Sequence, residues 1–299
     1  MAIPRAIAVV ACASLVAAAG CDKKRLVINA SFAMVGEAVD AFFEESDTAL
    51  AAEAAPANLK LIEGMARGSP RNPELLLVAS QMFGMYAFGF LEDRDTDGDE
   101  RRLDERRAKG LYLRGKAYAL AALDLERDFD GMLSLDQASF ERALQEIGAD
   151  DVPGLFWLVF NWGLYVNLSR DDLAAISERS KIAAIAERIV ELDEGFYYGG
   201  AHMFLMVYYG TLGRAIGGDP ERAKAEFEKA RAFSRGKFLM TDYLFAETYC
   251  LQVMDRALFE KTLRGIIDAP DGLPAEQRLA NALAKEKAAR LLARADELF

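Results

Sequence analysis

Apolar residues recur every three or four positions through almost the whole chain, and no segment alternates apolar and polar residues as a half-buried strand would. This period predicts α-helices, and the eight prolines fall between the apolar runs. Short connections favour antiparallel neighbours. The sequence therefore predicts an all-α fold of about a dozen helices.

Prolines, caps and glycines set the expected helix ends. Pro56 is expected to open a short helix at its first turn, and Asp219 to cap the helix after it. Ser134 with Gln137 fits a capping box, and Ser169 is a further expected cap. The main expected helices are 33–50, 73–91, 105–125, 134–148, 153–168, 169–195, 196–216, 220–233, 239–253, 256–267 and 275–298.

Small and aromatic residues at helical spacing suggest paired helices. Ala223, Phe227 and Ala230 match the second-helix half of a tetratricopeptide unit, and Gly115 with Tyr118 resembles the first-helix half. No fixed period of about 34 residues connects these matches. A compact solenoid of cryptic tetratricopeptide-like helical pairs is the favoured architecture, and an irregular bundle is the alternative.

The first twenty residues have the pattern of a lipoprotein signal peptide. Arg5 is the only charged residue among them, and the run 6–19 is apolar apart from one serine. This run is shorter than the roughly 20 residues that a spanning helix needs. The ending Ala18-Ala19-Gly20-Cys21 is similar to a bacterial lipobox, which implies cleavage before Cys21 and acylation of its thiol.

The domain organisation follows from this signal. Residues 1–20 are expected to be the signal peptide, 21–30 a lipid tether and 31–299 one helical domain. Several acyl chains at Cys21 would supply a stable membrane anchor. Cys250 would then be the only free thiol, and we expect it to be a buried core residue. An ordinary signal peptide with a chance cysteine is the alternative.

Charge and motif content argue against two classes of function. The formal net charge is −11, and an acidic surface repels nucleic-acid phosphates and anionic lipid headgroups. The chain has one histidine and no P-loop, HExxH or GxSxG motif. We therefore expect no nucleic-acid partner and no enzymatic activity.

An acidic segment matches the ligand spacing of a calcium loop. Asp93, Asp95 and Asp97 are followed by a glycine, and Asp104 stands at the twelfth position. Glu100 replaces the apolar eighth residue, and Asp104 is shorter than the usual bidentate glutamate. A solvated acidic loop is the alternative, so calcium is the one candidate cofactor.

Two aromatic-rich runs, 153–168 and 196–216, are candidates for the wall of a ligand passage. Ligand pockets are mostly apolar and aromatic, with a few polar groups. A helix buried between layers would have the same composition, so plain core packing is the alternative. The candidate passage residues are Trp157, Trp162, Tyr197, Tyr198 and His202.

A series of short fragments occurs in consistent order over residues 30–299. The fragments include Ala79-Ser-Gln-Met82, Leu111-Tyr-Leu-Arg-Gly115, Gly154-Leu-Phe-Trp157, Asn161-Trp-Gly163, Tyr197-Tyr-Gly-Gly-Ala-His202, Gly217-Gly-Asp-Pro-Glu221 and Leu279-Ala-Asn-Ala-Leu283. This series resembles the T-component family of TRAP-associated lipoproteins, often called TatT, where TRAP denotes a tripartite, ATP-independent transporter. Residues 95–104 depart from the family pattern as an insertion.

The resemblance implies tetratricopeptide-like helical pairs, a trimeric assembly, an apolar passage through each protomer and association with the periplasmic solute-binding protein of a TRAP transporter. Our hypothesis is a lipoprotein that faces the periplasm and passes an apolar or organic-acid ligand. Its place in the inner or the outer membrane stays open. The alternative is a general scaffold lipoprotein for envelope protein assembly, which predicts no enclosed passage.

Overall fold

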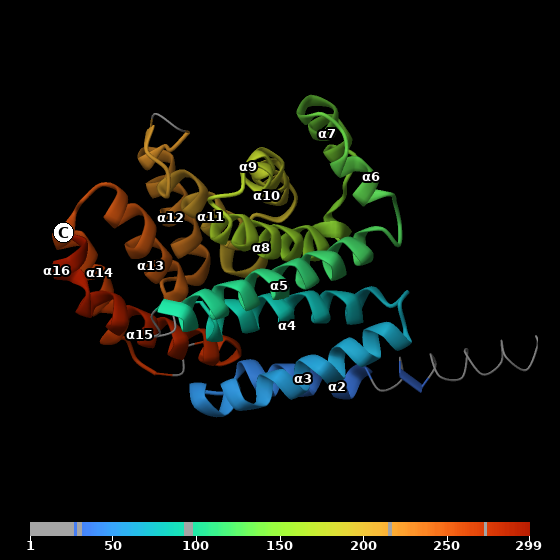
Figure 1. Cartoon of the computed structure of the whole chain (residues 1–299), viewed down its shortest axis with the longest axis horizontal. Helices are drawn as coiled ribbons and strands as arrows, with labels where there is room; N and C mark the ends of the chain where they lie inside the picture. The colour runs from blue at the N-terminus through green and yellow to red at the C-terminus, as the bar shows by residue number, and fades with distance from the viewer. Residues whose placement is uncertain (1–26, 29–31, 93–97, 215–216, 272–273) are drawn as a thin grey trace, which may run out of the picture.

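The computed structural model describes residues 27–28, 32–92, 98–214, 217–271 and 274–299. Within these ranges every regular element is helical, which confirms the all-α class (Figure 1). None of these helices is long and apolar enough to cross a membrane. The predicted signal peptide, residues 1–20, and Cys21 lie outside the described residues.

Helices α3, α4, α5 and α8 pack one on the next across the molecule (Figure 1). The later helices α11 to α15 cover one end of this stack, and α15 also contacts α3. The first half of the chain forms α2 (Phe32–Phe43), α3 (Thr48–Gly68), α4 (Pro73–Phe90), α5 (Gly98–Leu123), α6 (Phe129–Leu133), α7 (Gln137–Leu144), the short η1 (Ala149–Asp151) and α8 (Val152–Leu168).

Within the described residues, the second half continues with helices of 4 to 16 residues, one 3₁₀ turn and one π-helical turn that extends α13. These elements are α9 (Leu173–Ser177), α10 (Arg179–Asp193), α11 (Phe196–Gly210), α12 (Pro220–Ser234), α13 (Leu239–Phe245), the π-turn η3 (Ala246–Cys250), α14 (Arg256–Ile267), η4 (Ala275–Gln277), α15 (Arg278–Ala293) and α16 (Ala295–Leu298).

Several helix ends differ from the predicted ones because an aspartate supplies the cap. Asp47 accepts hydrogen bonds from two backbone N–H groups and starts α3, so Pro56 lies inside this helix and does not open one. Asp136 caps α7, whereas Ser134 ends α6, so the predicted capping box is wrong. Asp172 takes the role predicted for Ser169.

Other predicted ends are confirmed. Pro73 stands in the first turn of α4, and the Asp219 side chain accepts from the Arg222 backbone N–H at the start of α12. Residues 98–104, predicted as part of an insertion, form the first turns of α5. Cys250 is fully buried, as predicted for a core residue, and burial raises its pKa to about 12.

A buried polar side chain joins α4, α5 and α8. The Asn161 amide nitrogen on α8 donates to the Ser80 backbone oxygen on α4 at 3.2 Å and to the Trp157 oxygen at 2.9 Å. The Ser80 hydroxyl donates to the Gly115 oxygen on α5 at 2.8 Å. A Cβ atom at Gly115 would lie 2.1 Å from Asn161 Oδ1, and one at Gly84 would lie 2.6 Å from it. Only glycine at these positions lets the helices approach this closely.

Small residues also bring α11 and α12 together. Ala223 and Ala230 on α12 are fully buried, and Gly210 on α11 faces the Ala223 methyl group. Phe227 lies on the same helix and stacks on Phe245 of α13 at a centroid distance of 3.8 Å. The small and aromatic residues recognised in the sequence thus pack a helix pair against its neighbour; a solenoid of such pairs remains a prediction.

The start of α11 departs from a regular helix. Tyr197, Tyr198 and Gly199 have φ values of 47°, 60° and 73°, which are left-handed. Such angles cost side-chain-bearing residues of the order of 1 kcal/mol or more each, and they persist only where surrounding contacts impose them. The predicted helix 196–216 is therefore irregular over its first turn and ends at Gly210.

Replacing Gly115 with alanine should lower the free energy of unfolding by about 1–3 kcal/mol, because the new methyl group overlaps Asn161. Gly110 is the matched control on the same helix, with open space around its Cα. Gly110→Ala should raise stability by about 0.5–1 kcal/mol. Urea unfolding followed by circular dichroism measures both values; equal effects would contradict the packing described here.

Candidate ligand-binding site

A cavity of about 800 Å³, called the chamber below, lies between α4, α8, α11, α13, η3 and α15, with the start of α5 at its rim. This volume is within the range of small-molecule sites. Most of its wall is apolar, with Phe160 and Leu164 from α8, Met203 from α11 and Met240 from α13. A mostly apolar cavity of this kind favours the apolar part of a ligand because entry removes hydrocarbon surface from water.

The chamber changes character along its length. Phe156 packs on Tyr197 at a centroid distance of 5.0 Å. Seven residues further along each helix, Gly163 faces the Phe204 ring. Residue numbers increase in the same direction along both helices from one contact to the next, so α8 and α11 run parallel. The start of both helices provides an aromatic end of the chamber. Their other end is polar, where the lining includes Asn167, Arg170, Asp171 and Thr211.

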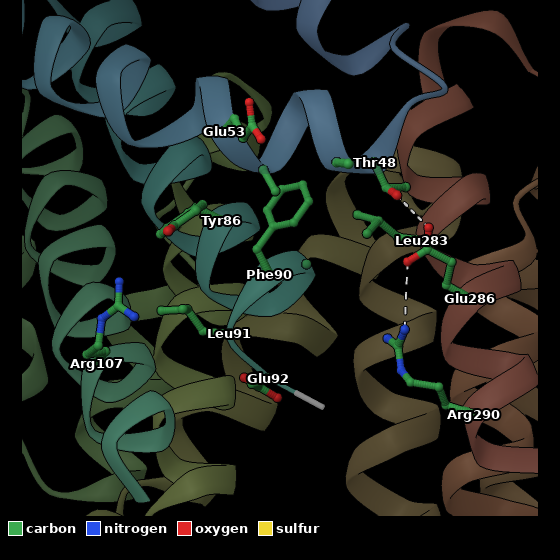
Figure 2. A pocket seen from close by; sticks show the side chains of 13 residues that line it. Thr48, Glu53, Tyr86, Phe90, Leu91, Glu92, Arg107, Leu283, Glu286 and Arg290 are labelled. Atoms are coloured by element: carbon green, nitrogen blue, oxygen red, sulfur yellow. Dashed lines mark hydrogen bonds and ion pairs between the residues drawn. The ribbon is translucent and has the colours of Figure 1, made fainter. Parts of the chain in front are cut away.

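A second cavity of about 460 Å³, called the cleft below, lies between α3, α4, α5 and α15. Figure 2 shows Phe90 and Tyr86 on α4 facing this space, with charged residues around it. Thr48 donates a hydrogen bond to Glu286, which also lies 3.7 Å from Arg290. The cleft is therefore more polar than the chamber, and it includes residues of the α3 surface.

Three residues line both cavities and so lie between them: Gly89, Glu92 and Leu283. Leu283 on α15 packs directly on Gly89 of α4, where a Cβ atom would lie 2.9 Å from Leu283 Cδ1. The Tyr112 hydroxyl donates to the Glu92 carboxylate, and Lys287 Nζ donates to the Glu92 backbone oxygen at 3.3 Å. Glu92 is thus held in place, and the Leu283 side chain is the apolar partition.

One of the five predicted passage residues lines the chamber. Tyr197 does, at its aromatic end, and burial raises the pKa of this phenol to about 12. Trp157 packs behind it at 5.3 Å between centroids. Trp162 Nε1 donates to Glu178 at 2.5 Å, and the Tyr198 hydroxyl donates to Glu276 at 2.6 Å. These three residues lie outside the chamber lining.

His202 is fully buried away from the chamber and forms a pair with Glu226 of α12, with 2.5 Å between Nδ1 and Oε2. Burial by itself would raise the pKa of Glu226, but the hydrogen bond and charge of His202 and the nearby charges of Lys229 and Arg222 lower it. His202 therefore joins α11 to α12. The adjacent Met203 faces the chamber instead, because consecutive helical side chains point about 100° apart.

The candidate calcium ligands Asp93, Asp95 and Asp97 lie outside the described residues, and the loop stays a prediction. Asp104 lies within α5, is 3% exposed and pairs with Arg107 at 3.2 Å. Among the described residues no group of three or more histidine, cysteine or acidic side chains could hold a metal ion.

Comparison with known proteins identifies the family to which the chain belongs. The sequence profile described as "TRAP transporter T-component" matches residues 44–299. The chain belongs to this family. One relative of this T-component, an "Uncharacterized protein" of Treponema pallidum (strain Nichols), is 26% identical over 313 aligned positions, which cover 96% of the chain and 95% of the relative. The family is a transporter component and not a family of enzymes.

Membership of the T-component family supports a role in TRAP transport and a place in the bacterial envelope or periplasm. It also implies partnership with other parts of a TRAP transporter. The profile matches from α3 onward, so the elements that form the chamber and the cleft all lie within the matched region.

Filling the chamber of this T-component should weaken the binding of small apolar molecules. We expect the neutral fluorescent probe N-phenyl-1-naphthylamine to bind the purified protein. Leu164→Trp should lower the affinity by at least about tenfold, because the indole occupies the probe's space. Leu61→Trp is the control, since Leu61 is 61% exposed on α3. Fluorescence titration measures both, and equal affinities would place the probe elsewhere.

Proposed function

We propose that this T-component is a periplasm-facing lipoprotein that associates with the solute-binding protein of a TRAP transporter and passes an apolar or organic-acid ligand through its helical domain. The observation that carries the proposal is the large apolar chamber that meets a second cavity at Gly89, Glu92 and Leu283. The lipobox-like segment ending at Cys21 supports anchoring to the membrane by lipid.

Three further parts of this proposal rest on the family resemblance. They are the tetratricopeptide-like arrangement of the helical pairs, a homotrimeric assembly and the identity of the partner as a periplasmic solute-binding protein. The close packing of α11 on α12 through Ala223 and Ala230 is compatible with the first. We propose no enzymatic activity for the chain.

The rival proposal is a scaffold lipoprotein that assembles other envelope proteins on its surface. A scaffold needs an exposed binding face, and it has no use for a large, mostly apolar cavity between helices that core side chains would otherwise fill. The chamber of about 800 Å³ therefore favours the passage over the scaffold. The two proposals also differ in the expected effect of shortening Leu283, the apolar partition between the cavities, on ligand release.

Shortening the partition should open a second route out of the chamber. We expect Leu283→Ala to raise the dissociation rate of N-phenyl-1-naphthylamine at least about twofold, because the probe can then leave through the cleft. Leu279→Ala is the matched control: Leu279 is also a buried leucine on α15, and it lines neither cavity. Stopped-flow fluorescence measures the rates, and an unchanged rate in Leu283→Ala would contradict a passage at this point.

Co-purification from the native host tests the partner and the anchor together. The tagged chain should enrich in membranes and bring down the solute-binding protein encoded beside it. Cys21→Ser should remove acylation and release the chain from the membrane fraction. Mass spectrometry of the purified N-terminus identifies the lipid. Repeated absence of a solute-binding protein from the wild-type preparation would contradict the proposed partnership.

A further inference from the structure

Two arginines beside the polar end of the chamber form no ion pair with a carboxylate among the described residues. Arg170 follows α8 and lines the chamber, and Arg179 begins α10 and lines a side recess of about 40 Å³. The recess and the chamber share five lining residues, among them Asn167 and Phe204. The net charge of the chain is −11, so acidic partners are plentiful elsewhere.

Neighbouring backbone and amide groups fix the orientation of Arg170. Its Nε donates to the Asn167 backbone oxygen at 3.0 Å, and Nη2 donates to Asn167 Oδ1 at 2.7 Å. A guanidinium carries five N–H groups in one plane. The remaining N–H groups of Arg170 are therefore free of these two contacts, and the planar group can bind an anion through them.

Arg179 is half-buried against an aromatic ring. Its guanidinium carbon lies 5.1 Å from the centroid of Tyr208 on α11. Burial lowers the pKa of Arg179, Tyr208 opposes this shift, and the positive charge of Arg170 lowers the pKa further. Both guanidinium groups carry positive charge beside the lining residues that the recess and the chamber share, so a carboxylate at this end of the chamber would offset both charges.

The surroundings favour an anion over a cation at this point. The first turn of α10, a 15-residue helix, has no side-chain cap, and helix N-termini carry partial positive charge. The nearby acid Glu178 accepts a hydrogen bond from Trp162. Asp171 is exposed on the chamber rim and forms no ion pair with either arginine. Arg101 and Glu105, also on the rim, pair with each other at 3.3 Å.

We propose that Arg170 and Arg179 bind the carboxylate of a single-chain amphipathic acid whose apolar chain lies in the chamber. The inference rests on the proposed function, because it requires a ligand in the chamber. The polar end of α8 and α11 holds the head group, and the chain points along both helices toward Phe156 and Tyr197. The chamber thus selects an acid with a long hydrocarbon part over a small polar anion.

Displacement of N-phenyl-1-naphthylamine tests the head-group site. Decanoate and decan-1-ol have the same chain length, and only decanoate carries a charge. Arg179→Gln should weaken displacement by decanoate about tenfold, because a charge-assisted hydrogen-bond pair is lost. Arg170→Gln should have a smaller effect, since this residue is exposed. Displacement by decan-1-ol and binding of the probe should stay within about twofold.

The control is Arg142→Gln, which removes the same charge from the exposed face of α7, where Arg142 contacts Ser139. It should leave all three affinities unchanged. Arg179→Lys keeps the charge and should retain part of the decanoate affinity. If the double variant Arg170→Gln/Arg179→Gln binds decanoate as the wild type does, the head-group site is wrong. If the wild type does not bind the probe, the proposed function itself fails.

Discussion

The hydrogen bond from Asn161 to the backbone of α4 sets the spacing on which the rest of the structure depends. Asn161 occupies space that side chains at Gly84 and Gly115 would otherwise fill, so α4, α5 and α8 meet at nearly backbone-to-backbone distance. The face of α8 that does not meet α5 turns toward α11 and forms the chamber wall. A buried side-chain amide can donate its hydrogen bonds in only one arrangement of the helices, so it specifies that arrangement more strictly than apolar contact does. One face of α8 thus packs tightly on α4 and α5, and another face of the same helix lines the chamber.

The left-handed residues at the start of α11 set the position of the aromatic end. Tyr197 and Tyr198 have different partners. The Tyr197 side chain lines the chamber, whereas the Tyr198 ring stacks on Phe238 at a centroid distance of 5.2 Å and its hydroxyl donates to Glu276. A regular helical first turn would rotate both rings away from these partners. Ring contacts and the carboxylate hydrogen bond hold the strained backbone in place.

Local signals were readable from the sequence, whereas the cavities were not. Pro73 and Asp219 act through neighbours one turn away, so their roles follow from spacing alone. Pro56 was misplaced because the stronger signal, the Asp47 cap, lies upstream of it. Tyr197 could be singled out as aromatic, but Met203 and Leu283 face a cavity only because of how helices from distant parts of the chain are set against one another. The pairing of His202 with Glu226 has the same origin.

The contact of Leu283 with Gly89 places an aliphatic side chain between two spaces, beside Glu92. A leucine side chain moves between staggered wells about its own bonds, and its Cα stays in place as it does so. In the proposed passage, a ligand would therefore cross this point without a hinge between parts of the protein and without the microsecond-to-millisecond domain rearrangements on which many binding proteins rely. In the proposed passage, the torsional preferences of one aliphatic group and the absence of a methyl group opposite it would set how readily a ligand crosses between the two spaces.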